Sequence, residues 1–224
     1  MSETLYFTSH TLQEFALIFM GTVYVIRLIW LTRFVAGKER QAPTGLGTTA
    51  SKKGVIYSWA NVAMPWAMES SRTKWFLYLQ FVIFHLAVVA AISESFIIPY
   101  APGWLEASPL LVTIIQVVTM AGFLVGLTRI VRRLGNRYLR AISSPDDHFS
   151  LWLLTVWFFF AFMAAPNNYQ ATETWLNIYF VLTAFFLIYV PFSKISHYLY
   201  YPFTRYYLGK TLQRRGVFPM RQVG

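Results

Sequence analysis

The sequence predicts an all-α membrane protein, built as a bundle of five transmembrane helices. Hydrophobic residues make up 56% of its 224 residues and charged residues only 12%, about half the charge of a soluble domain. The charges are also missing from long stretches, each close to the roughly 20 residues that a spanning helix needs. Both observations favour a multi-pass protein of the cell membrane, meaning the cytoplasmic (inner) membrane.

Five apolar windows mark the expected spans of a single membrane domain, residues 1–224. They cover residues 12–32, 75–98, 110–131, 149–165 and 175–197. The fourth window is the shortest, and its helix could begin one turn earlier. Residues 54–71 are apolar and aromatic but too short and too mixed to span, so we expect an interfacial segment there. The start, MSETLYFTSH, has no basic region and no cleavage site, so we expect no removable signal peptide.

The basic residues are confined to one side of the expected spans. All but one fall in three stretches, residues 33–74, 129–140 and 194–221, and the exception is Arg27. The N-terminal tail and the linkers 99–109 and 166–174 contain no Lys or Arg. The positive-inside rule therefore predicts that the N-terminus lies outside and the C-terminus in the cytoplasm. Because topology accounts for most of the net charge of +10, we expect no nucleic-acid partner; any surplus suits anionic lipid or an acidic cytoplasmic protein.

The chain has four histidines and no cysteine. Without cysteine, it cannot form disulfides, ligate iron–sulfur clusters or build a thiolate zinc site. His85 lies inside the second window, in FVIFHLAVVAA, with no charged residue within eight positions on either side. An imidazole in hydrocarbon costs free energy unless it is paired or binds a ligand. His85 is therefore the first candidate for a cofactor ligand.

His197 lies at the inner end of the fifth window and is the candidate partner of His85. Two histidines on different helices suit the axial positions of a low-spin haem, whereas zinc would require more protein ligands. The alternative is that His85 hydrogen-bonds a neighbouring helix and His197 reaches to the membrane surface. Arg27 has two interpretations as well, a partner for a haem propionate or an arginine that extends to the interface.

Asp146, Asp147 and His148 form a polar entry to the fourth window. Either aspartate suits an N-cap, which would place His148 in the first helical turn. His148 is then either an interfacial polar residue or, together with the two aspartates, a proton-handling group near a quinone. His10, in the expected outer tail, has the simpler interpretation of a solvated side chain.

Three segments resemble a known family. VPFSKISHYLYYPFTRY, at the end of the fifth window, is similar to a segment of the gamma subunit of respiratory nitrate reductase. The membrane cytochrome b subunits of heterodisulfide-reductase-like and sulfite-reduction-associated complexes share that segment. SRTKWFLYLQFVIFHLAVV resembles their second helix, and SSPDDHFSLWLL resembles the acidic entry to their fourth helix. The resemblance covers nearly the whole chain.

The resemblance implies a membrane subunit that binds haem b and passes electrons between a quinone and an iron–sulfur protein in the cytoplasm. The family usually holds two stacked b haems between its second and fifth helices. The inner ligands correspond here to His85 and His197. The outer ligands correspond to Ser95 and Tyr179, neither of which is an ordinary haem ligand. We therefore expect one haem b rather than two.

Alternatives to this expectation remain for the ligand pair and for the function. Counting about 1.5 Å per residue, His85 and His197 lie at different depths in their windows, which leaves His85 with His148 as a second pairing. A haem-free membrane anchor or assembly subunit on a cytochrome-like scaffold is the alternative function. A transporter is less favoured, because the spans hold no carboxylate except Glu14 and Glu94 near the outer ends.

Overall fold

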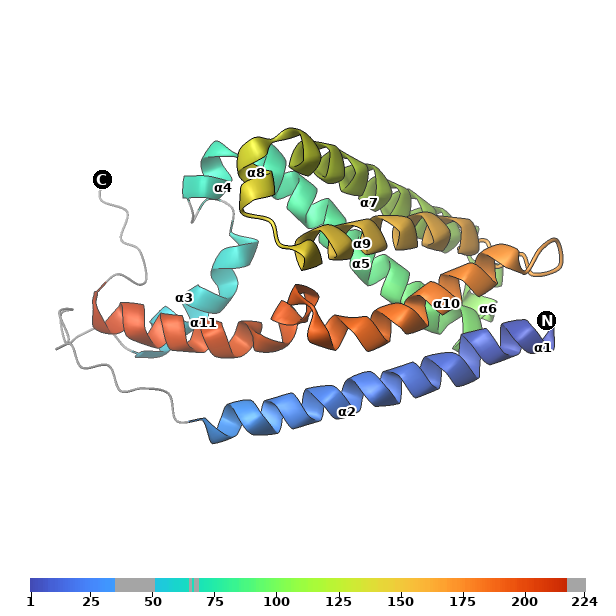
Figure 1. Ribbon diagram of the computed structural model, residues 1–224, viewed down its shortest axis with the longest axis horizontal. Helices are drawn as coiled ribbons and strands as arrows, with labels where there is room; N and C mark the ends of the chain where they lie inside the picture. Colours follow the sequence, from blue (N-terminus) through green and yellow to red (C-terminus); the bar gives the residue numbers. More distant parts are fainter. Residues whose placement is uncertain (35–50, 65, 67–68, 217–224) are drawn as a thin grey trace. The chain divides into compact units, whose positions relative to one another are not determined.

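The computed structural model describes residues 1–34, 51–64, 66 and 69–216, which form helices joined by short turns, with no strand in these ranges (Figure 1). Residue contacts divide the chain into two compact units. Unit 1 holds residues 1–26 and 80–195, and unit 2 holds residues 27–79 and 196–224. Unit 1 contains most of the spanning helices and the main hydrophobic core.

Five helical stretches are long and apolar enough to cross a membrane, which confirms the five expected spans. They are Glu3–Arg33, Trp75–Tyr100, Pro109–Gly135, Pro145–Ala164 and Thr174–Phe192. The fourth stretch does begin a turn before its window. The first begins much earlier than expected, because the residues interpreted as an outer tail are helical. The fifth ends before His197, so that residue lies beyond the span rather than at its inner end.

The N-terminal helix is continuous but changes its winding. Helix α1 (Glu3–Tyr6) is capped by Ser2, whose hydroxyl accepts a hydrogen bond from the backbone N–H of Leu5. A π-helical turn (Phe7–Thr11) follows and leads directly into α2 (Leu12–Arg33). A π turn inserts an extra residue into an α-helix and is frequent at functional sites.

Two spanning helices begin with a serine cap followed by proline. Ser108 caps α7 (Pro109–Gly135). Ser144 caps α9 (Pro145–Ala164) and forms a reciprocal capping box with Asp147. Proline suits the first helical position because its missing N–H would have no partner there. The N-cap expected at Asp146 or Asp147 is therefore Ser144, and Asp147 completes the cap from inside the helix.

Small residues bring the spanning helices of unit 1 close together. A methyl group on Gly122 of α7 would lie 2.2 Å from the Cβ of Ala87 on α5 (Trp75–Tyr100). One on Gly126 would lie 2.4 Å from the Oγ1 of Thr155 on α9. Small residues allow this approach in membranes, where helix association depends on packing rather than on the hydrophobic effect. Helix α10 (Thr174–Tyr189) packs on the other side of α9.

The two ends of unit 1 differ in charge. One end, here called the N-terminal end, holds residues 1–10, the short α6 (Gly103–Ala107) and the loop 165–173 (Figure 1). It carries no Lys or Arg. The opposite end holds α8 (Arg137–Ala141), the start of α9 and the end of α10, together with a cluster of arginines. This asymmetry is what the positive-inside argument requires.

Two 3₁₀ turns separate α10 from the last helix. They cover Val190–Phe192 and Lys194–Ser196, and α11 (His197–Arg214) begins immediately afterwards. Pro191 is buried within the first turn and cannot donate the backbone hydrogen bond that would continue α10. The PFSK segment therefore forms the turn that leads to His197.

Unit 2 is built on a close pair of helices, α3 (Ser51–Ala60) and α11. A Cβ on Gly209 would lie 2.6 Å from the Cα of Val55, so only glycine allows this approach. Trp59 Nε1 donates a hydrogen bond to the Pro202 carbonyl at 3.0 Å. The expected interfacial segment 54–71 contains most of α3, a 3₁₀ turn (Asn61–Ala63) and the start of α4 (Glu69–Thr73); residues 65 and 67–68 lie outside the described residues.

Candidate functional site

His85 lies on α5 in unit 1, and its side chain is exposed at the surface of the helix. Its Nδ1 lies 2.8 Å from the backbone carbonyl oxygen of Phe81, one turn earlier. Because a carbonyl oxygen can only accept, Nδ1 must donate and therefore carries the proton. In the neutral ring, Nε2 then holds the lone pair. This tautomer is the one in which a histidine binds a metal through Nε2 while a backbone carbonyl orients the ring.

Neighbouring aromatic side chains fix the orientation of this imidazole. The ring of Phe81 lies 4.1 Å from the His85 ring, centroid to centroid. Phe84, the preceding residue, is buried and meets Phe158 edge to face at 5.1 Å. Since Phe84 points into the core, adjacent His85 projects from a different side of α5. The site on α5 is therefore one oriented imidazole at an otherwise apolar helix surface.

His197 and Arg27 both belong to unit 2. His197 is the first residue of α11 and is exposed. Arg27, half-buried on α2, lies with its Nη1 3.5 Å from the hydroxyl of Tyr200. Tyr200 follows His197 by three residues, so the two share one face of the first helical turn. The structure thus brings the Arg27 guanidinium to the turn of α11 that carries His197.

The acidic entry to α9 is held by hydrogen bonds to the segment that follows α10. Asp147 accepts from the Ser144 backbone N–H at 2.8 Å and pairs with Lys194 Nζ at 2.7 Å. Asp146 accepts from the hydroxyl of Tyr189 and, at 3.0 Å, from the backbone N–H of Lys194. Both carboxylates therefore connect the start of α9 to the VPFSK turn. Half-buried His148 lies one residue further, in the first turn of α9, as expected.

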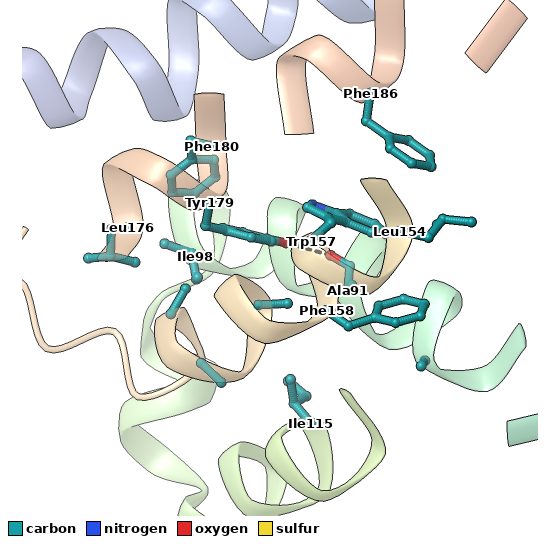
Figure 2. Close-up of a cluster of buried hydrophobic side chains, with 14 of the residues drawn as sticks. Ala91, Ile98, Ile115, Leu154, Trp157, Phe158, Leu176, Tyr179, Phe180 and Phe186 are labelled. Carbon is teal, nitrogen blue, oxygen red and sulfur yellow. Dashed lines mark hydrogen bonds between the residues drawn. The ribbon is translucent and has the colours of Figure 1, made fainter. Parts of the chain in front are cut away.

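Ser95 and Tyr179, which the resemblance matched to outer haem ligands, are both buried in unit 1. Tyr179 is fully buried, and its hydroxyl donates to the carbonyl of Ala91 on α5 at 2.5 Å (Figure 2). Ser95 Oγ donates to the Ile92 carbonyl of its own helix at 2.7 Å. Trp157 of α9 stacks on the Tyr179 ring with an angle of 11° between planes.

Two further side chains in this core form hydrogen bonds. Trp157 Nε1 donates to the hydroxyl of Thr183 at 2.8 Å, and that hydroxyl donates to the Tyr179 carbonyl at 2.7 Å. Phe180 and Leu176 complete the packing around Tyr179 (Figure 2). Side chains thus fill the surroundings of Tyr179, and its hydroxyl is committed to the Ala91 carbonyl.

A cavity of about 290 Å³ opens at the N-terminal end of unit 1, and the sequence analysis missed it. Its polar lining includes His10, Glu106, Asn167 and Tyr169. His10 belongs to the π-helical turn, where its ring stacks on Tyr6 at 4.5 Å. The cavity escaped the sequence analysis because it forms between three segments far apart in the chain. The Ser2 cap was the one local signal that residues 3–11 are helical.

No group of three or more His, Asp or Glu side chains gathers in a way that could hold a metal ion, within the described part of the chain. The structure places His148 beside the acidic cluster, and Arg27 beside the first turn of α11, while His85 lies in the other unit from His197. Comparison with known proteins finds no match: no family model, no curated protein and no solved structure matches this chain.

Proposed function

We propose that this chain is a haem b electron-transfer subunit that links the quinone pool of the cytoplasmic membrane to an iron–sulfur protein on the cytoplasmic side. The observation that carries the proposal is the position and the tautomer of His85. It is an imidazole in a membrane-spanning helix, oriented by the Phe81 carbonyl with Nε2 as the lone-pair nitrogen. A histidine in this setting is expected to bind something, because an imidazole is expensive in hydrocarbon.

The proposed site holds one haem. His85 has the tautomer that an axial ligand needs, and His197 is the proposed second ligand, with His148 as the alternative. Arg27, at the turn that carries His197, supplies a positive charge for a haem propionate. Haem would supply one-electron transfer, with the protein setting its potential through ligands and burial. The chain's own contribution is to hold the imidazoles and to neutralise the propionate.

The residues present do not fit a second, outer haem. Tyr179 is fully buried, its hydroxyl is committed to Ala91, and Trp157 stacks against its ring. A haem there would have to displace this aromatic core. The proposal is therefore a one-haem subunit, with any second site supplied by other ligands or other subunits.

Charge supports the proposed orientation and partners. The N-terminal end of unit 1 has no Lys or Arg, so we place it outside, and the arginine-rich end in the cytoplasm. The basic residues there would attract an acidic surface on an iron–sulfur partner or anionic lipid. His148, next to the acidic cluster at that end, is the proposed proton-handling residue for a quinone.

A reduced-minus-oxidised spectrum and a pyridine haemochrome assay of the purified full chain test the proposal. We expect the spectrum of a b haem and one haem per chain. A chain with full helical content and no haem absorbance would refute it and favour the alternative, a haem-free membrane anchor or assembly subunit. The packed core around Tyr179 is compatible with either function. The haem assay therefore distinguishes a haem b subunit from a haem-free anchor.

A further inference from the structure

A buried carboxyl group in the packed half of α5 plays no part in the proposed haem site. Glu94 is fully buried, and neither carboxyl oxygen has a hydrogen-bond partner within the described residues. It lies on the buried face of α5 that also holds Ala87, Ala91 and Ile98. An ionised carboxylate is very unfavourable in such a place unless a cation pairs with it.

Among the described residues, the titratable and charged groups around Glu94 include no such cation. Tyr179 of α10 is the titratable group that interacts with it electrostatically. Residues 109–128 of α7 and 149–164 of α9 contain no Lys, Arg or His. Arg129 of α7 lies instead over the ring of Phe84, ten residues and about 15 Å along α5 from Glu94. Glu14 of α2 accepts from the Tyr100 hydroxyl at 3.0 Å.

The cavity at the N-terminal end reaches to within one helical turn of this carboxyl group. Ile98 lines the cavity, and it follows Glu94 by four residues on the same face of α5, about 6 Å along the helix. Phe180, the neighbour of Tyr179, lines it as well. The cavity is large enough for several water molecules and has polar groups to hold them.

A carboxyl group and an imidazole line this cavity. Glu106 belongs to the short helix α6, and His10 lies in the π-helical turn. His10 Nδ1 is 2.9 Å from the hydroxyl of Ser9, which in turn donates to the Leu5 carbonyl at 2.7 Å. The ring is thus held at the cavity by its own helix.

We propose that Glu94 binds a proton within the bundle and exchanges it with water at the N-terminal end through this cavity. At rest the side chain is a neutral carboxylic acid. When it ionises, the proton passes to cavity water, with His10 and Glu106 at the mouth, and it returns by the same route. No electron moves in this step. The inference does not depend on haem, so it can fail or succeed separately from the proposed function.

Infrared spectroscopy of the purified full chain in H₂O and D₂O at neutral pH tests this site. We expect the carbonyl stretch of a protonated carboxylic acid, which shifts in D₂O and is lost in Glu94→Gln. Glu14→Gln is the matched control, since it removes the other carboxyl group near the outer end of a span and should leave the band unchanged. Glu94→Asp should move the band rather than remove it, so the assignment does not depend on one variant.

A substitution that narrows the cavity tests whether the proton reaches Glu94 through it. Ile98→Phe should keep the band in H₂O but slow its shift after transfer to D₂O, because the larger ring closes the inner end of the cavity. The proposal is overturned if the wild type lacks the band, or if the band survives in Glu94→Gln. An unchanged exchange rate in Ile98→Phe also overturns it, since the proton would then reach Glu94 by another path.

Discussion

The stretches of α5 around His85 and around Ser95 differ sharply in their surroundings, although one apolar helix carries both. Near Ala91 the helix meets Tyr179, on which Trp157 stacks, and both side chains are buried and hydrogen-bonded (Figure 2). At His85 the side chain is exposed, and its Nδ1 bonds a carbonyl of its own helix.

This difference shows that one apolar helix can present closely packed and exposed surroundings about 15 Å apart along its length. Around Ala91, the aromatic side chains of α9 and α10 fill the space beside the helix. At His85, the ring is oriented by Phe81 of the same helix. The neighbouring helices, and not the composition of α5, therefore decide which of its residues are buried. The predictions below test each half of the comparison in turn.

The largest expected effect is the loss of haem when a proposed histidine ligand is removed. His85→Ala should abolish the haem spectrum, because an iron that loses one axial imidazole is weakly held, and His197→Ala should do the same. Absorbance of the purified variants measures this. His10→Ala and Ser95→Ala are the controls and should keep full haem content. If His148→Ala loses haem while His197→Ala keeps it, the pair is His85 with His148, and the VPFSKISH stretch is a surface anchor.

In the packed core around Tyr179, removal of the Trp157 ring should cause the largest loss of stability. Trp157→Ala should lower the free energy of unfolding by about 3–5 kcal/mol, since it leaves a cavity and removes the donor to Thr183. Denaturant titration followed by far-ultraviolet circular dichroism would measure the loss. Trp152→Ala, an exposed tryptophan on the same helix, is the matched control and should have little effect. Equal losses in the two variants would mean that the aromatic core is not the stabilising element.

A smaller effect is expected from the single hydrogen bond between α10 and α5. Tyr179→Phe keeps the ring stacked on Trp157 but removes the donor to the Ala91 carbonyl, so it should lower stability by about 1 kcal/mol. The same denaturant titration applies, with Tyr206→Phe, exposed on α11, as the control. Haem content should not change. Loss of haem in this variant would show that Tyr179 belongs to a cofactor site rather than to a packed core.

The smallest effect should come from the ion pair that closes the acidic cluster. Lys194→Ala should cost less than about 1 kcal/mol, because 62% of the lysine side chain is exposed. Asp147→Asn should cost more, since Asp147 also completes the helix cap with Ser144. Thermal unfolding of the two variants side by side would show the order. A larger loss for Lys194→Ala would mean that the turn before His197, and not the cap, depends on this pair.

The amino-acid sequence by itself determined the helical class and the five spans. Hydropathy is a local property, and a bilayer requires each span to satisfy its own backbone hydrogen bonds. The early start of the fourth helix follows from Ser144 and Pro145, which are local signals as well. His85 could be singled out in the same way, because one imidazole in an apolar window is conspicuous without any knowledge of its neighbours.

Only the tertiary structure decided what the polar residues contact. The pairing of Asp146 and Asp147 with the VPFSK turn and the hydrogen bond from Tyr179 to α5 required the arrangement of the backbone. The cavity depends on residues 1–10, the end of α5, α6, the loop before α10 and Phe180, which are distant in the sequence. Such contacts join residues that are distant in the sequence, so neither the composition nor the spacing of apolar residues predicts them. Any of several helix arrangements would bury the same apolar faces.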